Sequence, residues 1–161
     1  MQRGFNDEFF KFNGDTVIIE DNQYVEANSV KSIYMDTMGH DAMPEGDQFY
    51  VVRLKTIDNK LFKICRGDMQ HFSSDTIKTM AKWLQKYGDF QQYGSSVINL
   101  PLVEKPTIEI DGHITKVGVK FKDGDVVTAV NTPFQRVARK TYDKLKEDLV
   151  KYRSQNKIHL R

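Results

Sequence analysis

The chain has 161 residues, of which 39% are hydrophobic and 29% are charged, a balance typical of globular rather than disordered proteins. No apolar run approaches the roughly 20 residues of a membrane-spanning helix, and the amino terminus lacks the apolar segment of a signal peptide. The single cysteine, Cys65, excludes an intramolecular disulfide and a cysteine-rich zinc site. His40 lies in a polar loop over residues 36–47, for which solvation is expected rather than metal binding. We therefore expect a cytoplasmic protein with no cofactor, no metal and no membrane partner.

The first 90 residues predict antiparallel strands followed by one helix. β-branched and aromatic residues dominate four segments, and the expected strands cover residues 15–20, 30–35, 49–56 and 60–65. The last two flank the short turn Asp58-Asn59 and predict a hairpin.

A helix is expected next, beginning near Ser73 or Ser74, because a serine hydroxyl can cap the first turn. Its apolar residues recur three and four positions apart, which predicts one buried stripe. The stripe consists of Ile77, Met80, Ala81, Leu84 and Tyr87. Gly88 is expected to end the helix, and Trp83, which lies outside the stripe, is expected to pack at a domain junction.

The second half predicts a connector over residues 89–96, then four strands and a long helix. The expected strands cover residues 97–100, 107–110, 113–121 and 126–130. Asp111-Gly112 between alternating segments predicts a type I′ hairpin turn. Thr132 is the expected cap of the final helix and Pro133 its first residue. The apolar stripe of this helix consists of Ala138, Tyr142, Leu145, Leu149 and Tyr152.

Together these patterns predict an α+β fold with two domains. Residues 1–90 are expected to form a small antiparallel β-barrel or sheet with one carboxyl-terminal helix. Residues 95–161 are expected to form a β-meander followed by a long basic amphipathic helix.

Positive charge is concentrated at the carboxyl end. Residues 134–161 contain nine basic and three acidic side chains, a net charge of +6 in a chain whose formal total is +2. This asymmetry predicts an anionic partner, and nucleic acid is the first candidate because its phosphates attract clustered lysine and arginine. The expected phosphate contacts are Arg136, Arg139, Lys140, Lys144, Lys151, Arg153, Lys116 and Lys120.

Two alternatives to nucleic acid stay open for the basic helix: a solvated face, and a protein or small-anion partner. Three acidic residues can each pair with a base four positions away along the helix. The pairs are Arg139 with Asp143, Lys144 with Asp148 and Glu147 with Lys151. The cations left over are Arg136, Lys140, Lys146, Arg153, Lys157 and Arg161.

Lys116 and Lys120 are expected on one face of a strand, with Gly118 between them and the opposite face toward the core. A glycine between two lysines would let a nucleic-acid backbone approach closely. The sequence contains no zinc finger, RNP-type aromatic motif or compelling helix-turn-helix, so we expect binding of low specificity.

Two His-x-(Ser/Thr) elements, His71-Phe72-Ser73 and His113-Ile114-Thr115, resemble the paired motifs of the two-histidine phosphoesterases. In that family each histidine acts as acid or base while the hydroxyl residues hold phosphate. The resemblance implies an alternative in which His71, Ser73, His113 and Thr115 cleave a cyclic nucleotide or oligonucleotide.

Gly14-Asp15-Thr16-Val17 resembles the opening of KOW and Tudor-type small barrels, in which Gly-Asp-x-Val precedes the first strand. In size, composition and plan the chain is similar to the MotB-type family of small phage DNA-binding proteins, which have a KOW-like amino-terminal part and a β-rich DNA-binding part. The resemblance implies a phage protein that coats or compacts DNA in the host cytoplasm and alters host transcription.

We therefore expect a non-enzymatic DNA-binding protein of low specificity. The alternative is a phage counter-defence protein that sequesters or cleaves a nucleotide signal, with the cations lining a pocket for a few phosphates. A third hypothesis is a protein-interaction module that binds a host protein through the amino-terminal sheet.

Overall fold

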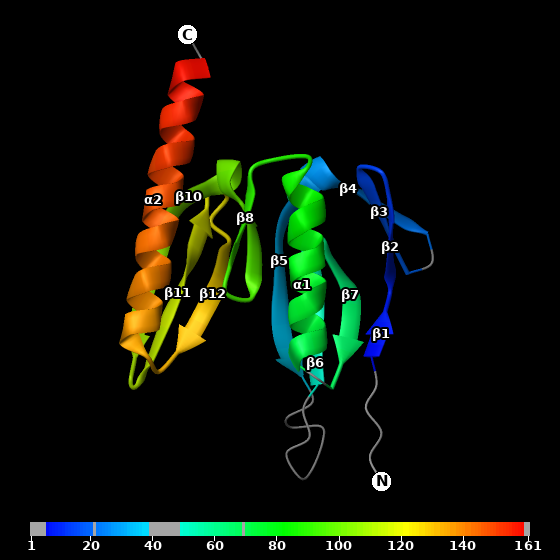
Figure 1. The fold of residues 1–161 in the computed structure, drawn as a ribbon, viewed down its shortest axis with the longest axis horizontal. Coiled ribbons are helices and arrows are strands. Elements are labelled where there is room, and N and C mark those ends of the chain that lie inside the picture. Colours follow the sequence, from blue (N-terminus) through cyan, green and yellow to red (C-terminus); the bar gives the residue numbers. More distant parts are fainter. Residues whose placement is uncertain (1–5, 21, 39–48, 69, 160–161) are drawn as a thin grey trace.

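The structure is a computed structural model, and it describes residues 6–20, 22–38, 49–68 and 70–159 (Figure 1). The strands are β1 (Asn6–Glu8), β2 (Phe10–Asn13), β3 (Thr16–Ile19), β4 (Gln23–Glu26), β5 (Val30–Met38), β6 (Phe49–Thr56), β7 (Leu61–Gly67), β8 (Phe90–Tyr93), β9 (Ser96–Asn99), β10 (Val103–Asp111), β11 (Ile114–Phe121) and β12 (Val126–Thr132). The helices are α1 (Gln70–Gln85), α2 (Gln135–His159) and the short 3-10 turns η1 (Ala27–Ser29) and η3 (Leu100–Leu102).

Three antiparallel sheets make up the β structure of the described residues. The largest has the order β1-β7-β6-β5-β9-β8, and the others are β10-β11-β12 and β2-β3-β4. Figure 1 shows α1 in front of the largest sheet and α2 in front of β10-β11-β12, so both helices lie on the same side. The expected α+β class is confirmed.

The expectation of an amino-terminal barrel is wrong for the described residues, which form no closed barrel. The strands proposed to build it are divided between two sheets, with β3 in one and β5, β6 and β7 in another. Both edges of β3 are already paired, one with β2 and the other with β4. No edge of β3 is therefore left to join the other strands into a closed ring.

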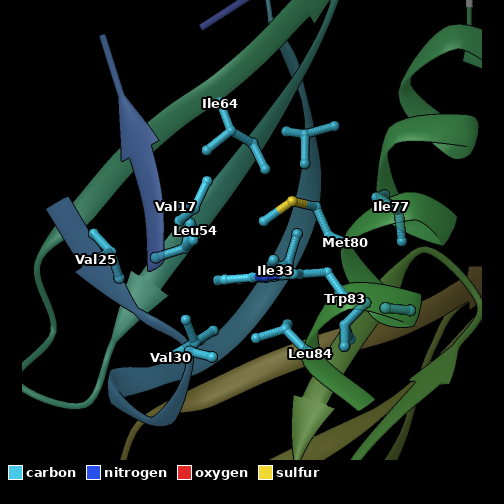
Figure 2. Packing of buried hydrophobic residues seen from close by; sticks show 14 of the residues in the cluster. Val17, Val25, Val30, Ile33, Leu54, Ile64, Ile77, Met80, Trp83 and Leu84 are labelled. Carbon is cyan, nitrogen blue, oxygen red and sulfur yellow. The ribbon is translucent and has the colours of Figure 1, made fainter. Parts of the chain in front are cut away.

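The first hydrophobic core lies between α1 and the strands behind it (Figure 2). Ile77, Met80, Ala81 and Leu84 are buried, which confirms the predicted stripe, whereas Tyr87 lies beyond the end of the helix and is exposed. Figure 2 shows Met80 near Ile33 of β5 and Leu54 of β6. Burying such a side chain contributes roughly 1.5–3 kcal/mol, so the stripe fixes α1 on the sheet.

Trp83 joins α1 to the small sheet rather than one half of the chain to the other. Its indole Nε1 donates a hydrogen bond to the carbonyl oxygen of Gly14 at 2.8 Å, and its ring lies 4.9 Å from the Phe12 ring. The indole is buried against the β2–β3 hairpin, so its role is structural.

Helix α1 begins three residues before the expected cap. Ser73 lies inside the helix and is completely buried, four positions before Ile77, so it continues the buried stripe as a small residue. The helix ends at Gln85, and Gly88 does not adopt the left-handed conformation of a terminating glycine.

The expected connector over residues 89–96 is instead most of a hairpin, formed by β8 and β9. All four residues of β9 are buried, so the polar–apolar alternation that marks a half-exposed strand is absent. β9 pairs with β5, with Ser32 opposite Ile98 and Tyr34 opposite Ser96. The start of the second half therefore extends the sheet of the first.

The predicted type of the turn at Asp111-Gly112 is corrected. Asp111 pairs with Ile114, so the loop residues are Gly112 and His113, and of these only Gly112 has a positive φ, +64°. This is the pattern of a type II′ turn rather than type I′.

Helix α2 begins two residues later than expected, because its first i to i−4 hydrogen bond runs from the Ala138 N–H to the Phe134 carbonyl. Thr132 Oγ1 accepts a hydrogen bond from the Phe134 N–H, so it fixes the turn before the helix. The predicted stripe of α2 is confirmed, with Ala138, Leu145 and Leu149 buried in a second core.

The two halves repeat one order of elements. A first unit (β2–β3, η1, β5–β6–β7, α1) and a second unit (β8–β9, η3, β10–β11–β12, α2) each contain a hairpin, a 3-10 turn, a meander and a helix. The first unit has one additional strand, β4, between β3 and η1. Four backbone hydrogen bonds of the first unit have a counterpart in the second. Written from N–H to carbonyl, with the counterpart in parentheses, they are Glu20 to Phe9 (Leu100 to Asp89), Ile57 to Ser29 (Lys122 to Leu102), Thr56 to Lys60 (Phe121 to Asp125) and Asn59 to Thr56 (Gly124 to Phe121).

Two β-bulges also recur at matching places. One lies between Val30 and Ser32 and again between Val103 and Lys105, and the other follows Val52 and again Val117. Bulges are specific features of a strand pair, so their recurrence shows that the two units share one backbone plan.

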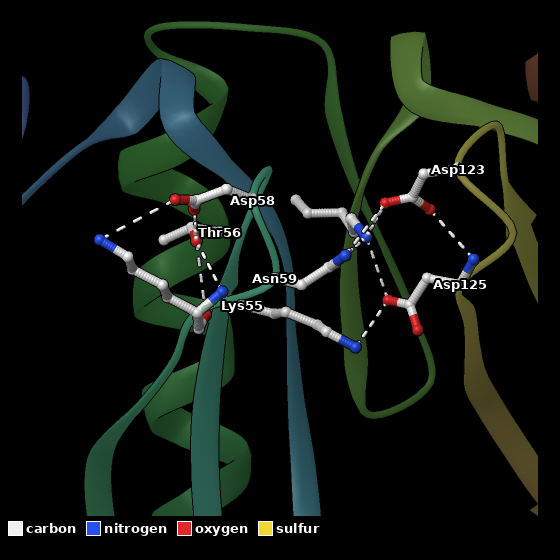
Figure 3. Close-up of polar contacts among 8 residues, drawn as sticks. Lys55, Thr56, Asp58, Asn59, Asp123 and Asp125 are labelled. Carbon is white, nitrogen blue, oxygen red and sulfur yellow. Dashed lines mark hydrogen bonds and ion pairs between the residues drawn. The ribbon is translucent and has the colours of Figure 1, made fainter.

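A buried ion network joins the units (Figure 3). Lys31 of β5 is 1% exposed, and its Nζ donates to Asp123 Oδ2 at 2.7 Å, to Asp125 Oδ2 at 3.1 Å and to the Asn59 side-chain oxygen. Lys55 Nζ lies 2.7 Å from Asp125 Oδ2. Figure 3 shows both carboxylates, from the turn between β11 and β12, facing Lys55 and Asn59 of the first unit.

The network shifts the pKa of both carboxylates. The hydrogen bond from Lys31 is the main cause that lowers the pKa of Asp123 to about 2. Burial alone would raise the pKa of Asp125, but hydrogen bonds and charges from Lys55 and Lys31 outweigh it and lower that pKa. Both carboxylates are therefore ionised at neutral pH and hold the second unit against the first.

Candidate nucleic-acid interface

The outer face of α2 is strongly basic. Residues 135–155 contain seven basic and three acidic side chains, a net charge of +4. All seven basic side chains are exposed: Arg136, Arg139, Lys140, Lys144, Lys146, Lys151 and Arg153. The apolar stripe fixes the opposite face on the β10-β11-β12 sheet, so the amphipathic pattern itself turns the cations toward solvent.

A hollow of about 780 Å³ separates the first half of α2 from the turn between β8 and β9. Its wall on the helix carries four cations and two acids: Arg136, Arg139, Lys140, Lys144, Asp143 and Glu147. Its wall on the hairpin contains Gln92 and Tyr93. A second hollow further along the helix is lined by Lys151 with Gln91 and Asp89. Lys140, Lys144 and Lys151 therefore follow the flank of α2 that faces the hairpin.

Lys144 is tied to this flank by a buried tyrosine. Its Nζ lies 3.0 Å from Asp148 Oδ1, and Tyr93 donates a hydrogen bond of 2.6 Å to Asp148 Oδ2. Burial, and then the Asp148 carboxylate, strongly raise the pKa of Tyr93, so the phenol keeps its proton. Of the three predicted ion pairs of α2, this is the one recorded among the described residues. Lys144 is therefore a weaker candidate for a phosphate than its neighbours.

Arg139, which also lines the first hollow, and Lys146 both lie over the ring of Tyr142. The Arg139 guanidinium is 5.9 Å and the Lys146 ammonium 5.4 Å from the centre of the Tyr142 ring. Such cation–π contacts leave the charges exposed and orient the side chains. Both cations stay available to an anion.

Arg153, a predicted phosphate contact, lies on the edge of β10. Its guanidinium donates to the carbonyl oxygens of Val103 at 3.2 Å and Glu104 at 2.5 Å, so it fixes α2 on the edge of β10. The side chain is exposed, yet its donors are directed at backbone.

Lys116 and Lys120 lie on the sheet face opposite α2. Thr115, Val117 and Val119 of the same strand are buried against the α2 side, which confirms the predicted alternation. Lys120 also lies 3.6 Å from the Glu104 carboxylate. These two lysines therefore do not share one surface with the cations of α2.

Gly118 lies where another strand of the same sheet comes very close. A Cβ at this position would lie 2.0 Å from the carbonyl oxygen of Val127, because β12 crosses closely at the bulge. The glycine is required by this contact within the sheet.

The four residues of the phosphoesterase hypothesis are not arranged as that hypothesis requires. Ser73 is completely buried in the first core, and Thr115 is buried in the second unit. His71 is exposed in the first turn of α1, and His113 is exposed in the turn between β10 and β11. The Ser73 hydroxyl is enclosed in the core, whereas Thr115 lines a hollow with Arg136 and Arg139 rather than with a histidine.

A second row of cations was missed from the sequence. Lys78, Lys82 and Lys86 are exposed and recur every four residues along α1 and just past its end, so they share its outer face. No ion pair is recorded for these three among the residues that the structure describes. The spacing of four was the available signal, but the row lies in the half of the chain with a net negative charge. Since α1 and α2 lie on one side of the molecule, the row belongs to the same basic side.

Three further residues named in the sequence analysis cannot be placed in the structure. His40 and Arg161 fall outside the described residues, and Lys157 lies in α2 without a described side chain. Within the described ranges, no three or more His, Cys, Asp or Glu residues come together as a metal site would require. Neither described helix has the length and apolar composition needed to span a bilayer.

Comparisons with protein-family models, with curated proteins and with solved structures find no match for this chain.

Proposed function

We propose that this chain is a DNA-binding protein of low specificity that contacts the phosphate backbone through the outer face of α2. The observation that supports the proposal most directly is the set of exposed cations on that face. In the described part of the chain, no carboxylate forms a recorded ion pair with Arg136, Arg139, Lys140, Lys146 or Lys151. Unpaired cations on a rigid helix attract a polyanion without losing a local partner.

The length of the cationic face suits several phosphates. Lys140 and Lys151 are eleven residues apart, which is about 16 Å along a helix at 1.5 Å per residue. One DNA strand carries a phosphate about every 3.4 Å of duplex axis, so roughly five phosphates span this distance. The proposed contacts are Arg136, Arg139, Lys140, Lys146 and Lys151.

Low specificity follows from the chemistry of the proposed contacts. Lysine and arginine that bind phosphates position a protein on DNA but read no base sequence. The face offers no described zinc module or second helix placed as a major-groove reader. Affinity is therefore expected to depend on salt much more than on sequence.

The test is binding to two duplexes of about 20 base pairs with unrelated sequences, measured by fluorescence anisotropy from about 50 to about 200 mM salt. We expect equal affinities and a slope of log K against log salt of roughly −4.5, since each of five phosphate contacts contributes about −0.9. Lys140→Ala and Lys151→Ala should each reduce the slope by about one. Absence of binding to either duplex at the lowest salt would contradict the proposal.

The matched control uses the other face of the same unit. Lys116→Ala with Lys120→Ala removes the same number of charges as Lys140→Ala with Lys151→Ala. We expect the first pair to change the slope less than the second, because its lysines lie on the sheet face opposite α2. Equal effects would favour a diffuse contribution of net charge over binding by α2.

The resemblance to the MotB-type family supplies a biological setting for this proposal: a phage protein acting on host DNA and transcription. The segment of this chain that resembles a KOW motif does not belong to a closed barrel, because β3 is paired on both edges within the small sheet β2-β3-β4. Contact with a host protein through the first unit belongs to the same proposal and is tested by capture with a variant whose α2 cations are removed.

A second function is favoured by the hollow beside the β8–β9 turn. Its volume, about 780 Å³, is within the range of roughly 300–1,000 Å³ for small-molecule sites, and four cations line it. This geometry supports sequestration of a nucleotide signal. Tight binding of a cyclic nucleotide, without binding of duplex DNA, would favour this function over the first.

A further inference from the structure

The repeated backbone plan makes two strand edges equivalent. β5 of the first unit and β10 of the second share the bulge after their first residue, so Val30 corresponds to Val103 and Ile33 to Pro106. Each strand pairs on one side with the middle strand of its meander. Their other edges should therefore be able to accept the same kind of partner.

The edge of β5 shows what that partner is. β9 pairs with it antiparallel, with Val97 opposite Ile33 at the centre. At the end of this pairing, the Asn99 side-chain amide donates a hydrogen bond of 2.8 Å to the carbonyl of Val30. The edge of β5 is thus filled by a strand and closed at one end by a side chain.

No strand is paired with the outer edge of β10 in the described residues, and the side chains of Arg153 and Pro106 obstruct it instead. Arg153 donates to the carbonyls of Val103 and Glu104, so it takes the acceptor that corresponds to the one Asn99 uses on β5. Pro106 stands where β5 has Ile33, at the centre of the pairing, and it has no N–H to donate. Because proline cannot bond to β11 either, the backbone of Pro106 faces the open edge.

The rest of β10 would suit a strand partner. Beyond Pro106 the strand continues with Thr107, Ile108, Glu109 and Ile110, three of which are β-branched, and Ile110 is 65% exposed. In the described residues, β10 has no sheet partner besides β11. An open strand edge of this kind, rich in β-branched residues, is a template for self-association unless it is blocked.

We propose that the outer edge of β10 is a latent dimer interface, at which β10 of a second copy would pair antiparallel, and that Arg153 and Pro106 keep it closed. A two-fold axis through Ile108 places Lys105 of each copy opposite Asp111 of the other, so the charges match across the pair. The same axis places Pro106 opposite Ile110, where the missing N–H removes a hydrogen bond at two symmetric points.

The test is the oligomeric state of the double variant Arg153→Ala, Pro106→Val, measured by sedimentation equilibrium on the full chain. We expect wild type to be monomeric and the variant to form a dimer, with a dissociation constant at least about tenfold lower than any value for wild type. Far-UV circular dichroism establishes that the variant is folded. If it is not, Pro106→Val alone restores the N–H with Arg153 in place, and weaker dimerisation is expected.

Two further variants locate the contact. Adding Lys105→Glu to the double variant puts like charges opposite each other twice, and should return the protein to the monomer. Lys78→Ala removes a cation from the outer face of α1, away from this edge, and should leave the wild-type chain monomeric. The proposal would be overturned if the folded double variant remained monomeric, or if it dimerised equally well with Lys105→Glu added. So would a wild-type chain that already dimerises.

Discussion

The ammonium of Lys31 lies 2.7 Å from the carboxylate of Asp123, although the two residues are 92 positions apart in the chain. The lysine is almost completely buried and the aspartate is partly exposed. A buried ammonium that loses its partners is strongly destabilising, so this pair makes the position of the second unit a condition for folding the first.

The stability that the ion pairs of Lys31 contribute should fall as the pH is lowered from 4 to 2. The pKa of Asp123 is about 2 in the folded chain, against an ordinary value of 3.8, and the pKa of Asp125 is lowered as well. A carboxyl group whose pKa falls on folding stabilises the protein above its unfolded pKa, and this stability is lost as pH falls through the folded pKa. Urea unfolding measured at a series of pH values should show the loss.

The variant Asp123→Asn should be less stable than wild type at pH 7 and should lose part of the pH dependence below pH 4. Asp111→Asn is the control, because Asp111 is an exposed residue of a hairpin end. Parallel pH profiles for Asp123→Asn and wild type would contradict the role of this ion pair.

Gly94 and Gly14 stand at matching hairpin turns, with φ of +56° and +64°. An alanine at either site has to adopt a left-handed conformation, which costs about 1–2 kcal/mol. At Gly94 the new Cβ would also lie 2.5 Å from the carbonyl oxygen of Ala129, whereas at Gly14 nothing lies within 4 Å. We expect Gly94→Ala to lower the free energy of unfolding clearly more than Gly14→Ala, as measured by urea titration; equal losses would argue against close packing of the β8–β9 turn on β12.

Removing the hydroxyl of Tyr93 should weaken the attachment of α2 to the β8–β9 hairpin. The hydroxyl donates to the Asp148 carboxylate at 2.6 Å, and hydrogen bonds to charged groups contribute about 1.5–3 kcal/mol. Tyr93→Phe is therefore expected to lower the free energy of unfolding by about that amount. Tyr24→Phe, at an exposed ring of β4, is the control and should have no effect. An unchanged stability for Tyr93→Phe would mean that Lys144 alone satisfies Asp148.

The lysine row of α1 should add to DNA binding if α2 is the main contact. Lys78→Ala, Lys82→Ala and Lys86→Ala together remove three exposed charges on the side of the molecule that carries α2. We expect lower affinity and a smaller salt slope for a duplex of about 20 base pairs. The effect should add to that of Lys140→Ala, because the two helices are separate contacts. An unchanged slope would confine the interface to α2.

Strands and helices with strong local patterns were predictable from the sequence. The β6–β7 hairpin, the meander β10–β12 and both apolar stripes follow from alternation and from spacings of three and four. The short strands β1, β2, β4 and β8 were not predicted. Each has three or four residues and lies at the edge of a sheet, so it is too short and too exposed to show a clear pattern of alternation.

The candidate site was predictable only as a list of cations. Helical spacing placed the basic residues of α2 on an outer face, and this holds in the structure. The sequence could not separate Arg153, which binds backbone carbonyls of β10, from Lys140, which does not, because that contact depends on how α2 lies on the sheet. Nor could it place Lys116 on the far face.

The repeated backbone plan was not detected in the sequence because only a few corresponding residues share a type, among them Gly14 with Gly94 and Val30 with Val103. Thr56 corresponds to Phe121 and Asn59 to Gly124, so the shared turn is made by unrelated side chains. At the first bulge, Lys31 in one unit corresponds to Glu104 in the other. Such pairs carry no similarity that a comparison of residues detects.

The pairing of β9 with β5 has a consequence for synthesis on the ribosome. When the first unit has emerged, β5 still lacks the strand that fills its edge, and Lys31 still lacks both of its carboxylates. Those partners lie between residues 96 and 125, so they leave the exit tunnel only later. A nascent chain halted between the two units would therefore carry an unfilled edge and an unmatched charge, and would be the species most exposed to chaperones and proteases.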